Sequence, residues 1–347
     1  MKKLLPAVAL AAALPATALA QSSVTLYGIA DAGIGWSDGD ASAGKGTMVV
    51  ESGYQATSRI GIRGTEDLGG GLKAVFNLES GIKLDTGESD ATGFWQRRAV
   101  VGLAGRFGEV VVGRDYTPGY KSAGLTDVMS YGLYGNWASF HTGANGITIR
   151  ASNGVHYAGK FGGLTLRASW AEGEVAQPGS SGDIYGVAAD WKSGPLVMQG
   201  YYQEINNAAG DAVKQAGIGA GYRFDGLRLT VSWGLADNPG SIRSATNIRK
   251  TQGLGLGAGI RVGAGEVLAQ LIRLDRSMVT GGDAKATVFG IAYVYPLSKR
   301  TNLYANIGMT KNNRNAAFAL RASGTGIAAG GLGSDPRGIA LGVKHTF

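Results

Sequence analysis

Apolar and polar residues alternate with a period of two in segment after segment of this 347-residue chain. The clearest example runs over residues 58–80, SRIGIRGTEDLGGGLKAVFNLES, where Ile60 and Ile62 share one parity and Arg59 has the other. Successive side chains of a β-strand point to opposite faces, so this pattern predicts strands with one apolar and one polar face. The glycines at 69–71 tolerate positive φ and allow the chain to reverse, which predicts a hairpin.

The alternating unit recurs up to the C-terminus. Further examples are 163–171, 226–236, 252–263, 302–310 and 339–347. A soluble β-protein could bury one such face against a core, but a lipid bilayer explains an apolar stripe on so many consecutive strands without one. Mean hydropathy is only +0.01, because alternating residues average out. No run of about eighteen apolar residues follows residue 20, so we expect no membrane-spanning helix.

The connections between these segments are alternately short and long. Short turns are expected near 68–71, 105–108, 159–163, 192–195, 225–226, 263–265 and 296–299. Long polar loops are expected near 38–57, 84–94, 115–152, 173–183, 205–213, 237–251, 276–284 and 312–335. An even strand number with turns at one end and loops at the other is typical of bacterial outer-membrane barrels. The barrel must close, because a free sheet edge in lipid would leave backbone groups unpaired. The prediction is an all-β fold, a 16-stranded antiparallel transmembrane β-barrel with short periplasmic turns and long extracellular loops.

The first twenty residues have the features of an export signal. Lys2 and Lys3 precede a short apolar region, and Ala18-Leu19-Ala20 fits a cleavage site. We therefore expect residues 1–20 to be a cleaved signal peptide and 21–347 to form the barrel. The chain has no cysteine, so disulfides cannot stabilise it after export. The formal charge is +8, but no Lys/Arg run or basic helix is present, and we expect no nucleic-acid partner.

Strand parity identifies charged residues that should face the lumen. They are Arg63, Lys73, Glu79, Arg167, Arg228, Arg261 and Lys344, together with Arg59. Positive residues dominate this set, which predicts a weak preference for anions. We interpret Arg167, Arg228, Arg261 and Lys344 as ordinary lumen charges far from the narrowest point. Parity is ambiguous around Arg97, Arg98 and Arg114, whose faces stay open.

Catalytic residues are not apparent. The histidines are His141, His156 and His345, which we expect at the surface or in the membrane interface. No G-x-S-x-G motif and no cluster with metal-ligand spacing occurs. We expect no enzymatic activity, no cofactor and no metal.

Several stretches together resemble the trimeric general diffusion porins of Gram-negative outer membranes, over essentially the whole mature chain. They are VTLYGIADAG at 24–33, SRIGIRGTEDLGGGLKAVFNLE at 58–79, RRAVVGLAGRFGEVVVGRDYTP at 97–118, YPLSKRTNLYANIG at 295–308 and GVKHTF at 342–347. The resemblance implies a water-filled barrel, three of which associate side by side. It also implies that the third loop, 115–152, folds into the lumen and narrows it.

The resemblance further implies a set of constriction residues. In members that favour anions, arginines at the positions of Arg59, Arg97 and Arg150 line the constriction. The last of these stands in a stretch that departs from the family, with Gly154 where serine is more common.

Two carboxylates of the third loop are candidates to complete the constriction. Asp115 and Asp127 are expected to face the arginines and set a transverse field. The alternative for Asp115 is a simple ion pair with Arg114 or another neighbour.

The family pattern also implies partners. The terminal Phe347 matches the aromatic residue that the barrel-assembly machinery reads, and the small residues Gly28, Ala30 and Ala32 suit close packing in a homotrimer. Outer-membrane lipid and lipopolysaccharide should surround the barrel. The predicted function is passive diffusion of small hydrophilic solutes and ions. The alternatives are a substrate-selective channel with a solute-binding constriction and an adhesin-like barrel that binds through its loops.

Overall fold

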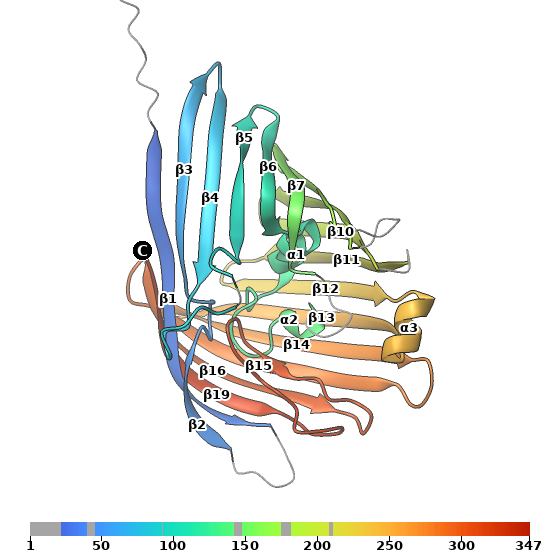
Figure 1. The fold of residues 1–347 in the computed structure, drawn as a ribbon. Coiled ribbons are helices and arrows are strands. Elements are labelled where there is room, and N and C mark those ends of the chain that lie inside the picture. Colours follow the sequence, from blue (N-terminus) through green and yellow to red (C-terminus); the bar gives the residue numbers. More distant parts are fainter. Residues whose placement is uncertain (1–21, 40–45, 92, 142–147, 175–181, 208–210) are drawn as a thin grey trace, which may run out of the picture.

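The computed structural model describes residues 22–39, 46–91, 93–141, 148–174, 182–207 and 211–347 (Figure 1). The expected signal peptide at 1–20 lies outside these residues. No helix in the described part of the chain is both long and apolar enough to cross a membrane.

One antiparallel sheet closes on itself into a barrel (Figure 1). Its strands are β1 (Ser23–Asp38), β2 (Thr47–Ser52), β3 (Arg59–Gly69), β4 (Leu72–Gly81), β5 (Arg98–Gly105), β6 (Gly108–Tyr116), β7 (Arg150–Phe161), β8 (Leu164–Ala171), β9 (Ile184–Ser193), β10 (Leu196–Asn206), β11 (Ala212–Arg223), β12 (Leu227–Asp237), β13 (Ile248–Val262), β14 (Gly265–Met278), β15 (Ala284–Pro296), β16 (Thr301–Asn312) and β19 (Arg337–Thr346). The first strand pairs with the last, from Ile29 opposite Thr346 to Asp38 opposite Arg337. The closure removes the sheet edges that lipid would otherwise expose.

The second position in the barrel is occupied by two strand pieces. Both β2 and β3 pair with β1, β2 along its C-terminal part and β3 along its N-terminal part. Counting them together gives sixteen strand positions among the described residues, as predicted. The expectation that 38–57 is a loop throughout is wrong, because it contains β2. Met48 and Val50 do alternate outward there, but six residues within a Gly- and Ser-rich segment give too short a period to recognise.

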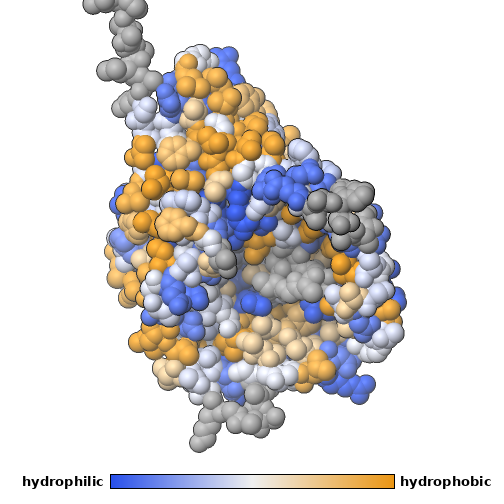
Figure 2. Space-filling model, viewed as in Figure 1, coloured by the Kyte–Doolittle hydropathy of each residue, from blue (hydrophilic) through white to orange (hydrophobic). Residues whose placement is uncertain are grey.

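Alternation along the strands separates an apolar outer face from a polar inner face. In β12, Leu229 and Val231 are exposed on the outside, whereas Thr230 and Ser232 are buried inside. Figure 2 shows the same separation, with hydrophilic residues bordering the central hollow and apolar residues frequent on the outer wall above it. An exposed apolar outer band is what a bilayer requires.

The third loop folds into the barrel, where Figure 1 shows its helices α1 (Pro118–Ala123) and α2 (Ala138–His141) inside the ring of strands. A 3₁₀ turn, Gly124–Thr126, follows α1. Two further short strands, β17 (Leu320–Arg321) and β18 (Gly326–Ile327), form a hairpin in the last loop, and α3 (Gly240–Thr246) lies at the rim. The expectation that the third loop enters the lumen is confirmed.

An apolar core inside the lumen holds the third loop against the wall. Trp137 and Phe140 are at most 2% exposed and belong to one cluster with Ile272 and Leu274 of β14. Glycines on the inner face of β13 make room for them, since a Cβ on Gly255 would lie 2.8 Å from the Trp137 ring. Burying each such side chain contributes about 1.5–3 kcal/mol, so the loop is anchored by packing as well as by hydrogen bonds.

One histidine departs from expectation. His156 lies in the middle of β7 and is only 5% exposed, with its Nε2 3.3 Å from the Gly113 carbonyl oxygen. Its interpretation as a surface or interface residue is wrong, because its even parity places it on the inner face. His345 is exposed on the outer face, as expected, and its Nδ1 lies 2.8 Å from Thr301 Oγ1.

Candidate pore constriction

A cavity of about 900 Å³ lies between the third loop and the barrel wall. Six cationic side chains and a single carboxylate, among the described residues, line it: Arg59, Arg97, Arg114, Lys121, Arg150, Arg321 and Asp90. The structure therefore brings together Arg59, Arg97 and Arg150, which the family resemblance nominated.

A buried carboxylate fixes two of these arginines. Glu79 of β4 is 7% exposed, and its Oε1 accepts a hydrogen bond from Arg97 Nε over 2.8 Å. Arg59 Nη1 lies 3.6 Å from the same oxygen, and Tyr27 Oη donates to Glu79 Oε2 over 3.0 Å. Parity predicted that Glu79 faces the lumen, but not that it would anchor the constriction. Breaking such a buried pair would leave an uncompensated charge, which is energetically costly. This cost keeps the two arginines in fixed positions.

A tyrosine fixes the third arginine. Tyr116 Oη accepts hydrogen bonds from Arg97 Nη2 over 2.8 Å and from Arg150 Nη2 over 3.0 Å. The Arg150 guanidinium also lies over the Tyr116 ring, 4.5 Å from its centroid. A cation–π contact of this kind contributes about 0.5–2 kcal/mol. The two guanidinium groups are thus held near each other despite their like charge.

The tyrosine is itself supported by a stack of rings. Tyr116 stacks on Tyr120 with centroids 5.4 Å apart, and Tyr120 stacks on Tyr131 with centroids 4.3 Å apart. Burial raises the pKa of Tyr120 to about 12, so this ring stays neutral at ordinary pH. The stack connects the constriction arginines to the folded third loop.

Three cations in the cavity were not identified from the sequence. Arg114 reaches it because the register of β6 on β7 shifts between Gly113 and Asp115, and such bulges re-aim side chains. Its Nε donates to the Gln96 carbonyl oxygen over 2.6 Å. Lys121 comes from α1 and Arg321 from β17, both in loops where no period indicates orientation.

The two predicted loop carboxylates do not line the cavity. Asp115 is 1% exposed and forms ion pairs with Lys121 at 3.0 Å and Arg98 at 3.1 Å. The alternative of a neighbouring pair therefore describes Asp115 better, although the partner is not Arg114.

Asp127 is 2% exposed and stabilises the loop's own backbone. It accepts hydrogen bonds from the N–H groups of Met129, Tyr131 and Trp137 at 3.1, 2.8 and 3.1 Å. Burial raises the pKa of this carboxyl, and the three N–H groups oppose that shift. The expected transverse field between Asp127 and the arginines is wrong, because the carboxylate is turned into the loop.

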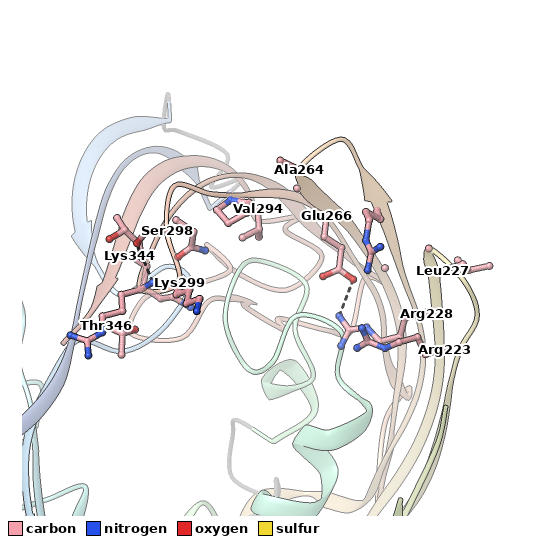
Figure 3. A pocket seen from close by; sticks show the side chains of 18 of the residues that line it. Arg223, Leu227, Arg228, Ala264, Glu266, Val294, Ser298, Lys299, Lys344 and Thr346 are labelled. Atoms are coloured by element: carbon pink, nitrogen blue, oxygen red, sulfur yellow. Dashed lines mark hydrogen bonds and ion pairs between the residues drawn. The ribbon is translucent and has the colours of Figure 1, made fainter. Parts of the chain in front are cut away.

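The remaining lumen residues lie away from this cavity. The Arg63 guanidinium lies 5.2 Å from the Tyr27 ring centroid, Lys73 is exposed near the first turn, and Arg167 forms an ion pair with Asp190. A second cavity, of about 430 Å³, contains the others at the end of the barrel with the short turns (Figure 3). They are Arg228, Arg261 and Lys344.

Comparison with known proteins agrees with this architecture. A profile described as Gram-negative porin matches residues 7–315. Outer membrane porin protein 32 of Delftia acidovorans is 37% identical over the whole of both chains. An outer membrane porin protein of Bordetella pertussis is 31% identical, again over the whole of both chains.

Solved structures show the same fold. A structure titled anion-selective porin from Comamonas acidovorans superposes with a TM-score of 0.82 at 34% identity, covering 94% of this chain and all of the other. The family match, the full-length relatives and the closed sixteen-strand barrel lead to one conclusion: this chain belongs to the Gram-negative porin family and is a porin of the outer membrane.

Proposed function

We propose that this porin passes small hydrophilic solutes and ions by passive diffusion and prefers anions. The observation that carries the proposal is the constriction cavity, where six cations and one carboxylate are the charged lining residues among those described. Charged side chains at a constriction set ion selectivity through their field, which is strongest where low-dielectric walls surround them. The similar structure whose title names an anion-selective porin supports the same sign. Diffusion of this kind involves no chemical step.

The constriction arginines favour anions without trapping them permanently. Glu79 neutralises part of the charge of Arg59 and Arg97, and Tyr116 occupies donors of Arg97 and Arg150. Arg59, Arg97 and Arg150 still line the cavity, where their positive charge can replace part of the hydration shell of a passing anion. Conduction requires binding weak enough for release, and partial neutralisation provides it.

We also propose that three copies associate side by side, with the short turns in the periplasm and the long loops outside. Lipid and lipopolysaccharide would cover the remaining outer wall, whose apolar side chains are exposed. We expect residues 1–20 to be removed after export and Phe347 to be read by the barrel-assembly machinery. In support of the last point, Phe347 exchanges both backbone hydrogen bonds with Gly28 of β1 at 3.1 Å, where the last and first strands join.

Planar-bilayer recording tests the function. Purified protein should give conductance steps in threes, and a KCl gradient should give a reversal potential with the sign of anion preference. A cation-selective reversal potential would overturn the assignment of the constriction charges. Folded protein that gives no conductance would overturn the proposal of an open pore.

A further inference from the structure

A second group of cations gathers at the end of the barrel where the short turns lie. Five strands and one turn supply the charged residues of this cavity: Arg223, Arg228, Arg261, Glu266, Lys299, Arg300 and Lys344. Its volume is about 430 Å³. None of these residues lines the constriction cavity, so the two sites are separate.

The charges in this cavity are strongly unbalanced. Six are positive, and Glu266 is the one carboxylate lining it in the described part of the chain. Glu266 pairs with Arg228 at 3.6 Å, and no ion pair joins the other five cations to a described carboxylate. Asp225 lies in an adjoining turn but is not part of the lining. Like charges gathered in a concave site repel one another and together attract a counter-ion.

The cations are arranged on two sides of the cavity. Figure 3 shows Arg223, Arg228 and Glu266 on one side and Lys299, Lys344 and Thr346 on the other. Gly259 keeps the first side open, because a Cβ there would collide with the Glu266 carboxylate and lie 3.3 Å from Arg228 Nε. Donors on opposite sides suit a ligand that carries negative oxygens at both of its ends.

We propose that this cavity is a binding site for a small polyvalent oxyanion of the pyrophosphate type. Guanidinium and ammonium groups are strong donors to phosphate oxygens, and several of them act together on one ligand. Only the role of this site, which is to concentrate anions at the turn end of the pore, rests on the proposed function. Binding itself requires nothing but the folded barrel. The cations here are therefore more than ordinary lumen charges.

The test uses full-length mature protein, folded in detergent, and inorganic pyrophosphate as the probe. Isothermal titration calorimetry gives the Kd for the unchanged protein, for the double variant Arg261→Gln/Lys344→Gln and for a matched control, Arg63→Gln/Lys73→Gln. The control removes two lumen cations that do not line the cavity. A third variant, Arg59→Gln/Arg150→Gln, reports on the constriction. Heat-modifiable migration on gels establishes that each variant is folded.

We expect Arg261→Gln/Lys344→Gln to raise the Kd about tenfold or more, since each charge-assisted hydrogen bond contributes on that scale. The control and the constriction variant should change the Kd by less than about threefold. An equal increase of the Kd in the control would show that pyrophosphate responds to the summed charge of the lumen and not to this cavity. That result would overturn the site. Loss of binding only in the constriction variant, or no binding to unchanged protein, would also overturn it.

Bilayer recording separates the site from the proposed function. Pyrophosphate added to the turn side should reduce chloride current at a lower concentration than when added to the loop side, and the double variant should lose this asymmetry. Pyrophosphate binding by a protein that gives no current would leave the site standing and refute the pore. Current without pyrophosphate binding would leave the pore standing and refute the site.

Discussion

Arg97 and Glu79 form a buried ion pair in which Nε and Oε1 are 2.8 Å apart and neither side chain is more than 9% exposed. The arginine immediately precedes β5, while the glutamate lies near the end of β4. The same carboxylate lies 3.6 Å from Arg59. One anion therefore positions two of the cations that define the constriction.

Replacing Glu79 by Gln should strengthen anion preference and weaken the fold. The variant leaves Arg59 and Arg97 without their shared counter-charge, which raises the positive potential of the cavity. Removing one partner of a buried pair costs about 3–5 kcal/mol. Reversal potentials in a KCl gradient and urea unfolding followed by tryptophan fluorescence measure the two effects. Glu109→Gln is the control, because Glu109 pairs with Arg98 at 3.4 Å and is 39% exposed. Reduced anion preference in the Glu79 variant would contradict the assignment.

Selectivity should be constant at neutral pH and decrease at alkaline pH. Burial lowers the pKa of Lys121, although Asp115 opposes the shift. This ammonium therefore loses its charge at a lower pH than an exposed lysine, whereas arginine in general keeps its proton over the range in which lysine titrates. Reversal potentials measured from about pH 6 to about pH 10.5 should show anion preference falling on the alkaline side. Lys121→Arg should abolish that fall, and an unchanged fall would assign it to another group.

Substituting Gly255 by Val should detach the third loop and leave the barrel intact. The new side chain would occupy the space of the Trp137 ring, since even a Cβ would lie 2.8 Å from it. Loss of the Trp137 contacts costs about 3–5 kcal/mol by analogy with large-to-small core changes. We expect larger and noisier single-channel conductance with normal heat-modifiable migration. Gly200→Ala is the control, because the nearest atom to its added Cβ is 3.8 Å away. Conductance equal to that of the unchanged protein would refute the anchoring role of Trp137.

Substitutions in β1 should distinguish a residue needed for barrel closure from residues needed for association of subunits. Gly28 lies under the Phe347 ring, and a side chain there would collide with that ring and with the Arg59 carbonyl oxygen. Gly28→Leu should therefore reduce the yield of folded barrel. Ala30→Leu and Ala32→Leu should instead yield folded barrels whose trimers dissociate at lower temperature, because these positions share the outward parity of Ile34. Gels of heated and unheated samples measure both outcomes, and heat-resistant trimers in both alanine variants would place the interface elsewhere.

Strand parity predicted most of the fold, because a barrel wall requires one lipid-facing and one water-facing side from every strand. It placed Glu79, Arg228 and Lys344 on the inner face. It missed β2, whose six residues are too few for a clear period, and it was ambiguous at Arg114, where a bulge shifts the register.

Strand parity could not predict how the side chains inside the third loop pack. Asp127 was given a role in the pore because of its charge, but its three backbone partners bury it. Arg321 reaches the cavity from the last loop, far along the chain from the other lining cations. Contacts of this kind depend on tertiary packing, which has no periodic signature in the sequence.

The break between β2 and β3 limits how far single loops of this pore can be exchanged independently of the rest of the barrel. At the break, the Tyr54 carbonyl oxygen accepts a hydrogen bond from Leu133 N–H in the third loop over 2.6 Å. Thr57 N–H donates to Ser323 Oγ in the last loop over 2.8 Å, and Arg59 begins β3 two residues later. A third loop grafted alone onto another barrel would therefore lose the hydrogen-bond partner that the break provides. A transplant that preserves selectivity has to carry three distant segments together: the interrupted wall strand, the inserted loop and the final hairpin.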